Sequence, residues 1–118
     1  MADKRTETID IVVEPAVHAL REALDNAGIT VDKIILFGSF AHGNETEASD
    51  IDLAVFSSAF TGIRFHDVSR IVDSVEPINS RLEIHPFRPE DLSGCDPFAS
   101  EILRTGIIIY DRKLMLHA

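Results

Sequence analysis

A polar loop between two apolar runs constrains the fold of this chain more than any other feature of its sequence. The first run covers residues 34–37 and stops at Gly38-Ser39, and the polar loop covers residues 42–49. The second run, residues 51–56, begins beside two acidic residues. Such a pattern predicts a strand, a tight turn, a loop and a second strand.

The acidic residues at the start of the second run are Asp50 and Asp52. Residues two apart in a strand point to the same side, so both carboxylates face one side, opposite to Ile51, Leu53 and Val55. Two carboxylates this close repel each other unless a cation lies between them. Oxygen ligands of this kind suit Mg²⁺, which takes one or two protein carboxylates together with substrate phosphates.

The turn after the first strand has residues that suit a phosphate site. Gly38 lets the backbone approach a ligand closely, and Ser39 adds a hydroxyl donor. Other motifs do not match: no Lys follows Gly43 as a P-loop requires, the Rossmann glycine spacing is absent, and an EF-hand loop beginning at Asp50 lacks its final acid. A solvated loop before an edge strand is a simpler alternative, but it does not explain why two acids open an apolar strand.

Together these residues resemble the motif of the DNA polymerase beta-like nucleotidyltransferases, and most closely that of their minimal stand-alone branch (MNT). The family motif is Gly-Ser, a short helical turn that ends in Gly, and Asp-x-Asp on the next strand. In this chain it reads Gly38, Ser39, Gly43, Ser49, Asp50, Ile51, Asp52 and Leu53. Neither part is specific alone, but the two at this spacing between apolar strands are. A final helix and short strand, residues 98–110, also look like the family's ending.

The resemblance implies an α+β fold, with a small mixed β-sheet and helices packed on one face, formed by residues 1–118 as a single domain. It also implies transfer of a nucleoside monophosphate from ATP or another triphosphate, with two Mg²⁺ ions as cofactors. The acids Asp50 and Asp52 would bind the metals. The nucleotide would bind to the motif residues Gly38, Ser39, Gly43 and Ser49, and to His42, which lies next to Gly43.

A transferase of this family also needs a third carboxylate on a neighbouring strand, usually Asp, which helps to activate the attacking hydroxyl. Glu83 is the candidate, and it would complete the catalytic and metal-binding set with Asp50 and Asp52. The alternative for Glu83 is a solvent-facing ion pair with Arg81 or Arg88.

Histidines mark the main departure from the family pattern. Family members often carry Arg just before the second Gly, where this chain has His42. A neutral imidazole supplies less charge to phosphate than a guanidinium, so transfer would be weaker or pH-dependent; an ordinary loop histidine is the alternative. His85 shares a strand face with Glu83 and could reach the site. The scattered histidines and the lone Cys95 predict no zinc site.

The resemblance also suggests an acceptor. Minimal family members are often paired with a small helical HEPN protein in toxin–antitoxin systems. By this resemblance the chain would be an MNT-type antitoxin that transfers AMP from ATP to a tyrosine of a HEPN-domain toxin. Two alternatives stay open: a non-catalytic antitoxin that neutralises its partner by contact, and a small-molecule adenylyltransferase. The nucleotide base, the choice of Mg²⁺ or Mn²⁺ and the formation of a homo-oligomer are left undecided.

Composition narrows the partners and the compartment. The formal net charge of −9 stays negative without the three acids assigned to metal, and such a surface repels phosphates, so no nucleic acid partner is expected. The single cysteine, Cys95, allows no internal disulfide and is interpreted as a structural or surface thiol. Without a signal region or membrane-length apolar run, we expect a cytoplasmic protein with no membrane contact.

Apolar spacing predicts the helices. The first covers residues 8–27 and stops at Gly28. Pro15 leaves two alternatives: one bent helix, which we favour, or an extended arm before a helix that begins at the proline. The second helix covers residues 64–75. Its predicted buried face consists of Val68, Ile71, Val72 and Val75.

The remaining elements follow from alternation and from helix signals. Strands are expected at residues 33–37, 51–56, 81–87 and 107–110. Pro86 indicates a strand end or a sheet edge. A turn or short helix is expected at residues 89–92. Asp96 and Pro97 then begin a helix that ends at Arg104, before Gly106.

Overall fold

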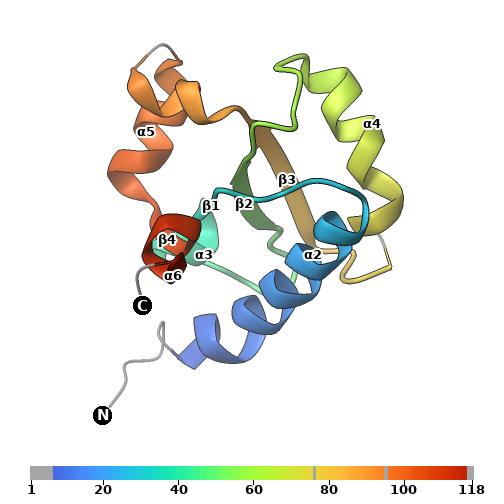
Figure 1. Cartoon of the computed structure of the whole chain (residues 1–118). Coiled ribbons are helices and arrows are strands. Elements are labelled where there is room, and N and C mark those ends of the chain that lie inside the picture. Colours follow the sequence, from blue (N-terminus) through green and yellow to red (C-terminus); the bar gives the residue numbers. More distant parts are fainter. Residues whose placement is uncertain (1–6, 76, 95, 117–118) are drawn as a thin grey trace.

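The computed structural model describes residues 7–75, 77–94 and 96–116, and a four-stranded sheet lies at the centre of these residues (Figure 1). Its strands are β1 (Lys33–Phe37), β2 (Ile51–Phe56), β3 (Leu82–Phe87) and β4 (Ile107–Asp111), in the order β3-β2-β1-β4. β1 pairs antiparallel with β2 and β4, whereas β2 and β3 are parallel. The sheet is therefore mixed, and the predicted α+β class is confirmed.

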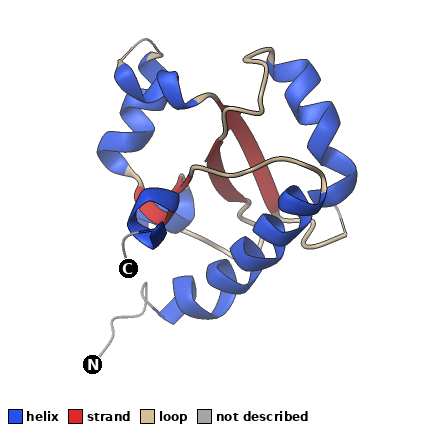
Figure 2. Ribbon diagram, in the orientation of Figure 1, coloured by secondary structure: helices blue, strands red, loops and turns tan. Residues whose placement is uncertain are grey.

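Helices lie around this sheet (Figure 2). α2 (Glu14–Asn26) and α4 (Arg64–Val75) pack against the main core, to which the strands contribute Ile34, Leu36, Leu53, Val55 and Ile84. α5 (Pro97–Thr105) packs on the other face through Ala99 and Ile102. The sequence predicted helices on one face. α5 is an additional cover, because apolar residues of the second face, Ile35, Ala54 and Phe56, also need burial.

The beginning of the chain agrees with the bent-helix interpretation. A π-helical turn, η1 (Ile9–Val13), runs directly into α2, and the Glu14 amide donates to the Ile9 carbonyl five residues before it. Pro15 lacks an amide hydrogen, and its ring clashes with the preceding turn of a regular α-helix. The wider π turn gives the ring room. Residues 7–14 are therefore helical and do not form an extended arm.

The buried face of α4 differs from the prediction. Ile71 and Val75 are buried, but Val68 is half-buried and Val72 is 46% exposed. Asp67 is buried instead. Its carboxylate accepts hydrogen bonds from the Thr61 amide at 2.8 Å, the Thr61 hydroxyl at 3.0 Å and the Gly62 amide at 3.0 Å. Because Asp67 must face inward to make these bonds, the helix is turned and Val72 faces outward.

Pro86 lies within β3 at an edge of the sheet, as its sequence position indicated. The Arg81 carbonyl accepts from the amide of Ile51, the first residue of β2, at 2.7 Å, and the Phe87 carbonyl accepts from the Ser57 amide just after β2 at 3.0 Å. Alternation therefore turns the backbone groups of Pro86 towards the free edge, where a missing amide hydrogen breaks no ladder bond.

The remaining elements of the described residues are three short helices. They are α3 (Ser39–His42), the 3₁₀ helix η2 (Pro89–Ser93) and α6 (Arg112–Leu116). Asp96 caps α5 as predicted, accepting from the Phe98 amide at 2.9 Å. Cys95 lies outside the described residues. Within those residues, no helix is both long and apolar enough to cross a membrane.

Asp67 gives the first testable prediction. Asp67→Ala leaves three donors without their buried acceptor, so it should lower the free energy of unfolding by about 2–3 kcal/mol. Asp73→Ala, on the exposed side of the same helix, is the control and should change it by less than about 0.5 kcal/mol. Urea denaturation of both variants measures the difference. Equal effects would contradict the role given to Asp67.

Candidate active site

Strand pairing brings distant motif residues to one end of the sheet. In the register of the sheet, Asp52 of β2 lies opposite Phe37, the last residue of β1, and opposite Glu83 of β3. Gly38 follows Phe37 directly. The Gly-Ser turn therefore lies beside Asp52, and Asp52 lies beside Glu83 on the next strand.

Gly38 is required by its conformation and by its neighbour. Its φ is +73°, a region that side chains rarely adopt, and a Cβ at this position would overlap Oδ2 of Asp52. The backbone of the turn is therefore in direct contact with a predicted metal ligand. No residue other than glycine leaves both the turn and the carboxylate undisturbed.

The short helix α3 holds the next predicted residues. Ser39 is its first residue and is half-buried, and His42 is its last residue and is exposed. Gly43 ends the helix with φ +75°. This is the short helical turn ending in Gly that the motif predicts.

Ser49 braces the loop that leads to the acids. Its hydroxyl accepts from the Thr46 amide at 2.8 Å, and its carbonyl accepts from Nε of Arg81 at 3.0 Å. Arg81 also donates to the Thr46 carbonyl at 3.1 Å, and its guanidinium lies over the Phe40 ring. The first residue before β3 thus ties down the loop that ends at Asp50.

Asp52, Glu83 and His85 form a close cluster. One ligand atom from each lies within 4.8 Å of the others, a spacing that could hold a metal ion. His85 Nε2 lies 3.5 Å from Oδ1 of Asp52 and 3.8 Å from Oε1 of Glu83. Asp50 is exposed at the start of β2 and belongs to the same acidic group, although not to this closest set.

The pKa of Glu83 is raised in this cluster. Burial, followed by the negative charges of Asp52 and Asp50, raises the pKa above its ordinary value of 4.5. Neither arginine proposed as an alternative partner pairs with Glu83: Arg81 binds loop carbonyls, and Arg88 pairs with Glu90 at 2.9 Å. With its side chain 50% exposed, Glu83 is accessible to a cation or substrate.

His85 is held from several sides. Its Nδ1 lies 3.3 Å from Nη2 of Arg64, and the rings of Phe37 and Phe98 meet it edge-on, with centroid distances of 4.9 and 6.1 Å. Burial, together with the positive charge of Arg64, lowers the His85 pKa, while Asp52 acts in the opposite sense.

Sequence reasoning placed His85 within reach of the site without giving it a role, and it missed Arg64 and Phe98. The alternation of residues 81–87 places His85 on the Glu83 face, so that signal was present. Arg64 begins α4 and Phe98 lies in the first turn of α5, and nothing in their local sequence places them beside His85.

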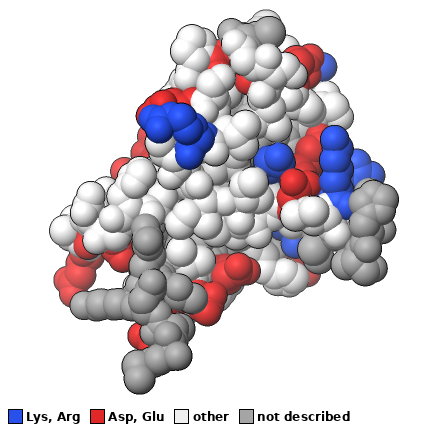
Figure 3. Space-filling view, turned by 90° about the vertical axis from the view of Figure 1, so that its left-hand side faces the viewer, with Lys and Arg blue, Asp and Glu red and all other residues white. Residues whose placement is uncertain are grey.

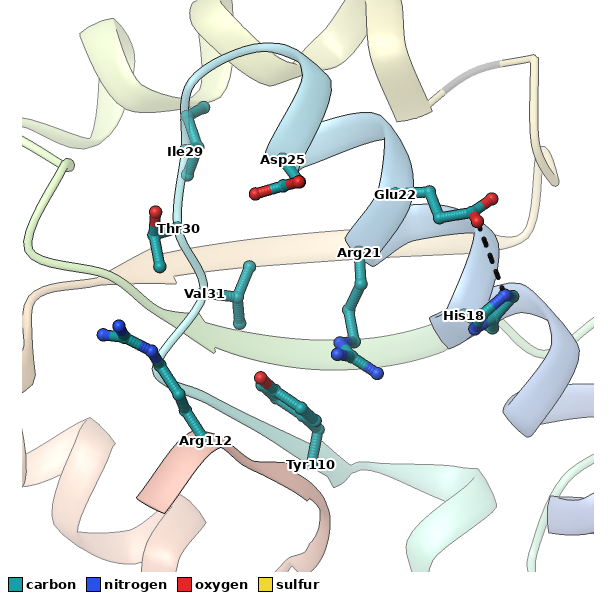
Figure 4. Close-up of a pocket in the computed structure, with 9 residues that line it drawn as sticks. All are labelled: His18, Arg21, Glu22, Asp25, Ile29, Thr30, Val31, Tyr110 and Arg112. Atoms are coloured by element: carbon teal, nitrogen blue, oxygen red, sulfur yellow. Dashed lines mark ion pairs between the residues drawn. The ribbon is translucent and has the colours of Figure 1, made fainter. Parts of the chain in front are cut away.

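Two hollows bear on where the site lies, one beside this cluster and one away from it. A groove of about 440 Å³ between α4 and β3 opens beside Glu83, and its lining includes Val68 and Val72. A second cavity, of about 310 Å³, is lined by residues from α2, the segment after it, β4 and α6 (Figure 4). There the Arg21 guanidinium lies over the Tyr110 ring, 3.7 Å from its centroid. None of the predicted site residues lines this second cavity, so it is not the motif's site.

The basic residues on the face shown in Figure 3 do not form one continuous patch. Figure 3 shows Lys and Arg in separate clusters, with uncharged surface and acidic residues between them. That face offers no continuous basic track of the kind that follows a phosphate backbone. The expectation of no nucleic acid partner stays a prediction.

The raised pKa of Glu83 predicts a pH-dependent stability change. A raised pKa means that the folded metal-free protein binds this proton more tightly than the unfolded chain, so the contribution is present below about pH 4.5 and is lost as pH rises. Ionised Glu83 therefore destabilises the fold at pH 7, and Glu83→Gln should raise Tm there, with a gain that shrinks towards pH 4. Exposed Glu47→Gln is the control. A gain independent of pH, or a lower Tm at pH 7, would contradict this.

Comparison with known proteins agrees with the geometry. The family described as "Polymerase beta, Nucleotidyltransferase" matches residues 19–114. A solved structure of a nucleotidyltransferase candidate from Sulfolobus solfataricus has a TM-score of 0.60 and 13% identity, over 96% of this chain and 92% of that chain. At this identity the likeness supports the fold alone. No curated protein matches the chain significantly. Because the family match covers most of the sequence and the motif residues meet in space, the chain belongs to the polymerase beta nucleotidyltransferase family.

Proposed function

We propose that the protein is a magnesium-dependent nucleotidyltransferase of the MNT branch, which transfers AMP from ATP to a tyrosine hydroxyl of a HEPN-type partner. The observation that carries the proposal is the contact of the Gly38 turn with Asp52, which lies opposite Glu83 on the neighbouring strand. A triphosphate on the turn would place its phosphates directly beside these acids.

The donor set fits a divalent cation. Carboxylate oxygens are the ligands that Mg²⁺ prefers, and Asp50, Asp52 and Glu83 supply them from adjacent strands. Burial and then the negative charges of Asp52 and Asp50 raise the pKa of Glu83, and a bound cation would favour its ionised form. Bound Mg²⁺ would polarise the triphosphate and neutralise the charge that develops on the leaving pyrophosphate.

The residues of the chain have separate tasks in this proposal. The Gly38-Ser39 turn holds the triphosphate, and His42, Gly43 and Ser49 shape the segment around it. The acceptor oxygen attacks the α-phosphorus, and the bond from that phosphorus to the bridging oxygen of the β-phosphate breaks. The hydroxyl proton passes to the carboxylate of Glu83. Pyrophosphate leaves, and the acceptor carries AMP.

The acceptor would approach from the β3 side. The groove between α4 and β3 reaches Glu83, and its apolar wall includes the exposed Val72. An apolar wall beside a catalytic acid suits a protein side chain with a terminal hydroxyl, such as tyrosine. The HEPN identity of the partner rests on the family resemblance. Contact neutralisation without transfer and adenylylation of a small molecule remain the competing functions.

Intact-mass measurement tests the proposal. The protein is mixed with ATP, Mg²⁺ and the product of the neighbouring gene, and Asp52→Asn is the control. We expect the partner to gain the mass of one or more AMP units with the wild-type protein and none with the variant. A stable complex without any gain would support neutralisation by contact. Absence of both complex and gain would contradict the protein-acceptor proposal and favour small-molecule acceptors.

Gly38 gives a sharper test of the site geometry. Gly38→Ala places a methyl group against Asp52 and should reduce transfer at least about 100-fold, since a misplacement of about 1 Å can cost that much. Gly28→Ala is the matched control: its φ is +82°, but no atom lies within 4 Å of the added Cβ. It shares the backbone strain of about 1 kcal/mol without the clash. Equal transfer rates for the two variants would contradict the assignment.

A further inference from the structure

We infer that Arg64 and His85 are positioning residues for the carboxylates of Asp52 and Glu83. In this arrangement Arg64 keeps the proton of the imidazole on Nε2, and the Nε2–H group points at both carboxylates. The catalytic part of the inference rests on the proposed function, whereas the proton placement can be measured without it.

The contact with Arg64 decides which nitrogen carries the proton. A guanidinium can only donate, so at 3.3 Å from Nη2 the Nδ1 atom must accept, and the proton of the neutral ring lies on Nε2. A ring protonated on Nε2 has no lone pair there for a metal. Although Asp52, Glu83 and His85 have the spacing of a metal site, His85 therefore serves as a donor to the two carboxylates that hold the metal.

The Nε2 atom is placed for this task. It is buried and makes no hydrogen bond among the described residues, and carboxylate oxygens lie 3.5 and 3.8 Å away. A movement of about 0.5 Å would bring Oδ1 of Asp52 to an ordinary N–H···O distance. Leaving a buried donor unsatisfied is costly, so the Nε2–H group favours carboxylate positions that face it.

The ring itself has little freedom to turn. Phe37 and Phe98 contact it edge-on, and the latter lies in the first turn of α5, which Asp96 caps. Arg64 begins α4, where Asp67 fixes the preceding loop. Two helix starts on different sides of the sheet thus hold one imidazole. Such support behind a ligand typically changes metal affinity or activity by about 10–100-fold.

Nitrogen-15 NMR of the side chains in the metal-free protein tests the proton placement. The His85 signals are assigned by their loss in His85→Gln. We expect Nε2 to carry the proton and Nδ1 to carry none, and Arg64→Met to shift the population towards the other tautomer. Arg70→Met is the control, because Arg70 lies on the same helix but donates to the Ala59 carbonyl, and it should leave the signals unchanged. A proton on Nδ1 in the wild type, or no response to Arg64→Met, would overturn the inference.

Kinetics tests the positioning role. His85→Gln keeps an N–H donor, whereas His85→Leu removes it. The leucine variant should therefore lose about 10-fold or more in kcat, while its KM for ATP changes less than about 3-fold. The glutamine variant should retain much of the kcat that the leucine variant loses. If both variants instead raise the Mg²⁺ concentration for half-maximal rate equally, His85 is a metal ligand and the inference is wrong. Absence of transfer in the wild type would refute the proposed function, and the NMR result would still decide the proton placement.

Discussion

The close contact between the Gly38 turn and Asp52 is the constraint on which the candidate site depends. It exists because β1 and β2 pair antiparallel in a register that sets Phe37 opposite Asp52. A slip of one residue would turn the carboxylate into the main core and would turn Ile51, Leu53 and Val55 out of that core. The buried side chains of Ile51, Leu53 and Val55 therefore fix the position of the acid as well as the core. The same residues stabilise the fold and place the chemistry.

The parallel pairing of β2 and β3 adds residues to the site that a hairpin of β1 and β2 alone would lack. It puts Glu83 beside Asp52, and the crossover helix α4 between the two strands delivers Arg64 to His85. Burial of Glu83 and then its repulsion with Asp52 and Asp50 raise its pKa, so the ionised carboxylate works against folding. The favourable free energy of apolar burial on both faces of the sheet offsets this local destabilisation. A site that is strained without its ligand gains more from binding a cation than a relaxed one would.

Local sequence patterns predicted most of the fold, because the strands and helices depend on spacing alone, and they proposed the residues at the centre of the candidate site. The strands around residues 34–56, the Gly-Ser turn and the pair of acids are encoded within one short stretch. Glu83 followed from the family resemblance, which requires a third carboxylate, and from its place on the polar side of its strand. Val72 was assigned wrongly to the core, since helical spacing cannot reveal that Asp67 claims the inward position. The role of Arg64 was missed because it depends on tertiary contacts between β3 and the first turns of α4 and α5.

Calorimetry of a non-hydrolysable ATP analogue tests the central claim, that the turn and the carboxylates bind a metal–nucleotide together. The account predicts binding that requires Mg²⁺ and is lost in Asp52→Asn. It also predicts that Asp73→Asn, which changes an exposed acid of α4, binds like the wild type. Binding of equal strength without Mg²⁺, or unchanged binding in Asp52→Asn, would contradict the account.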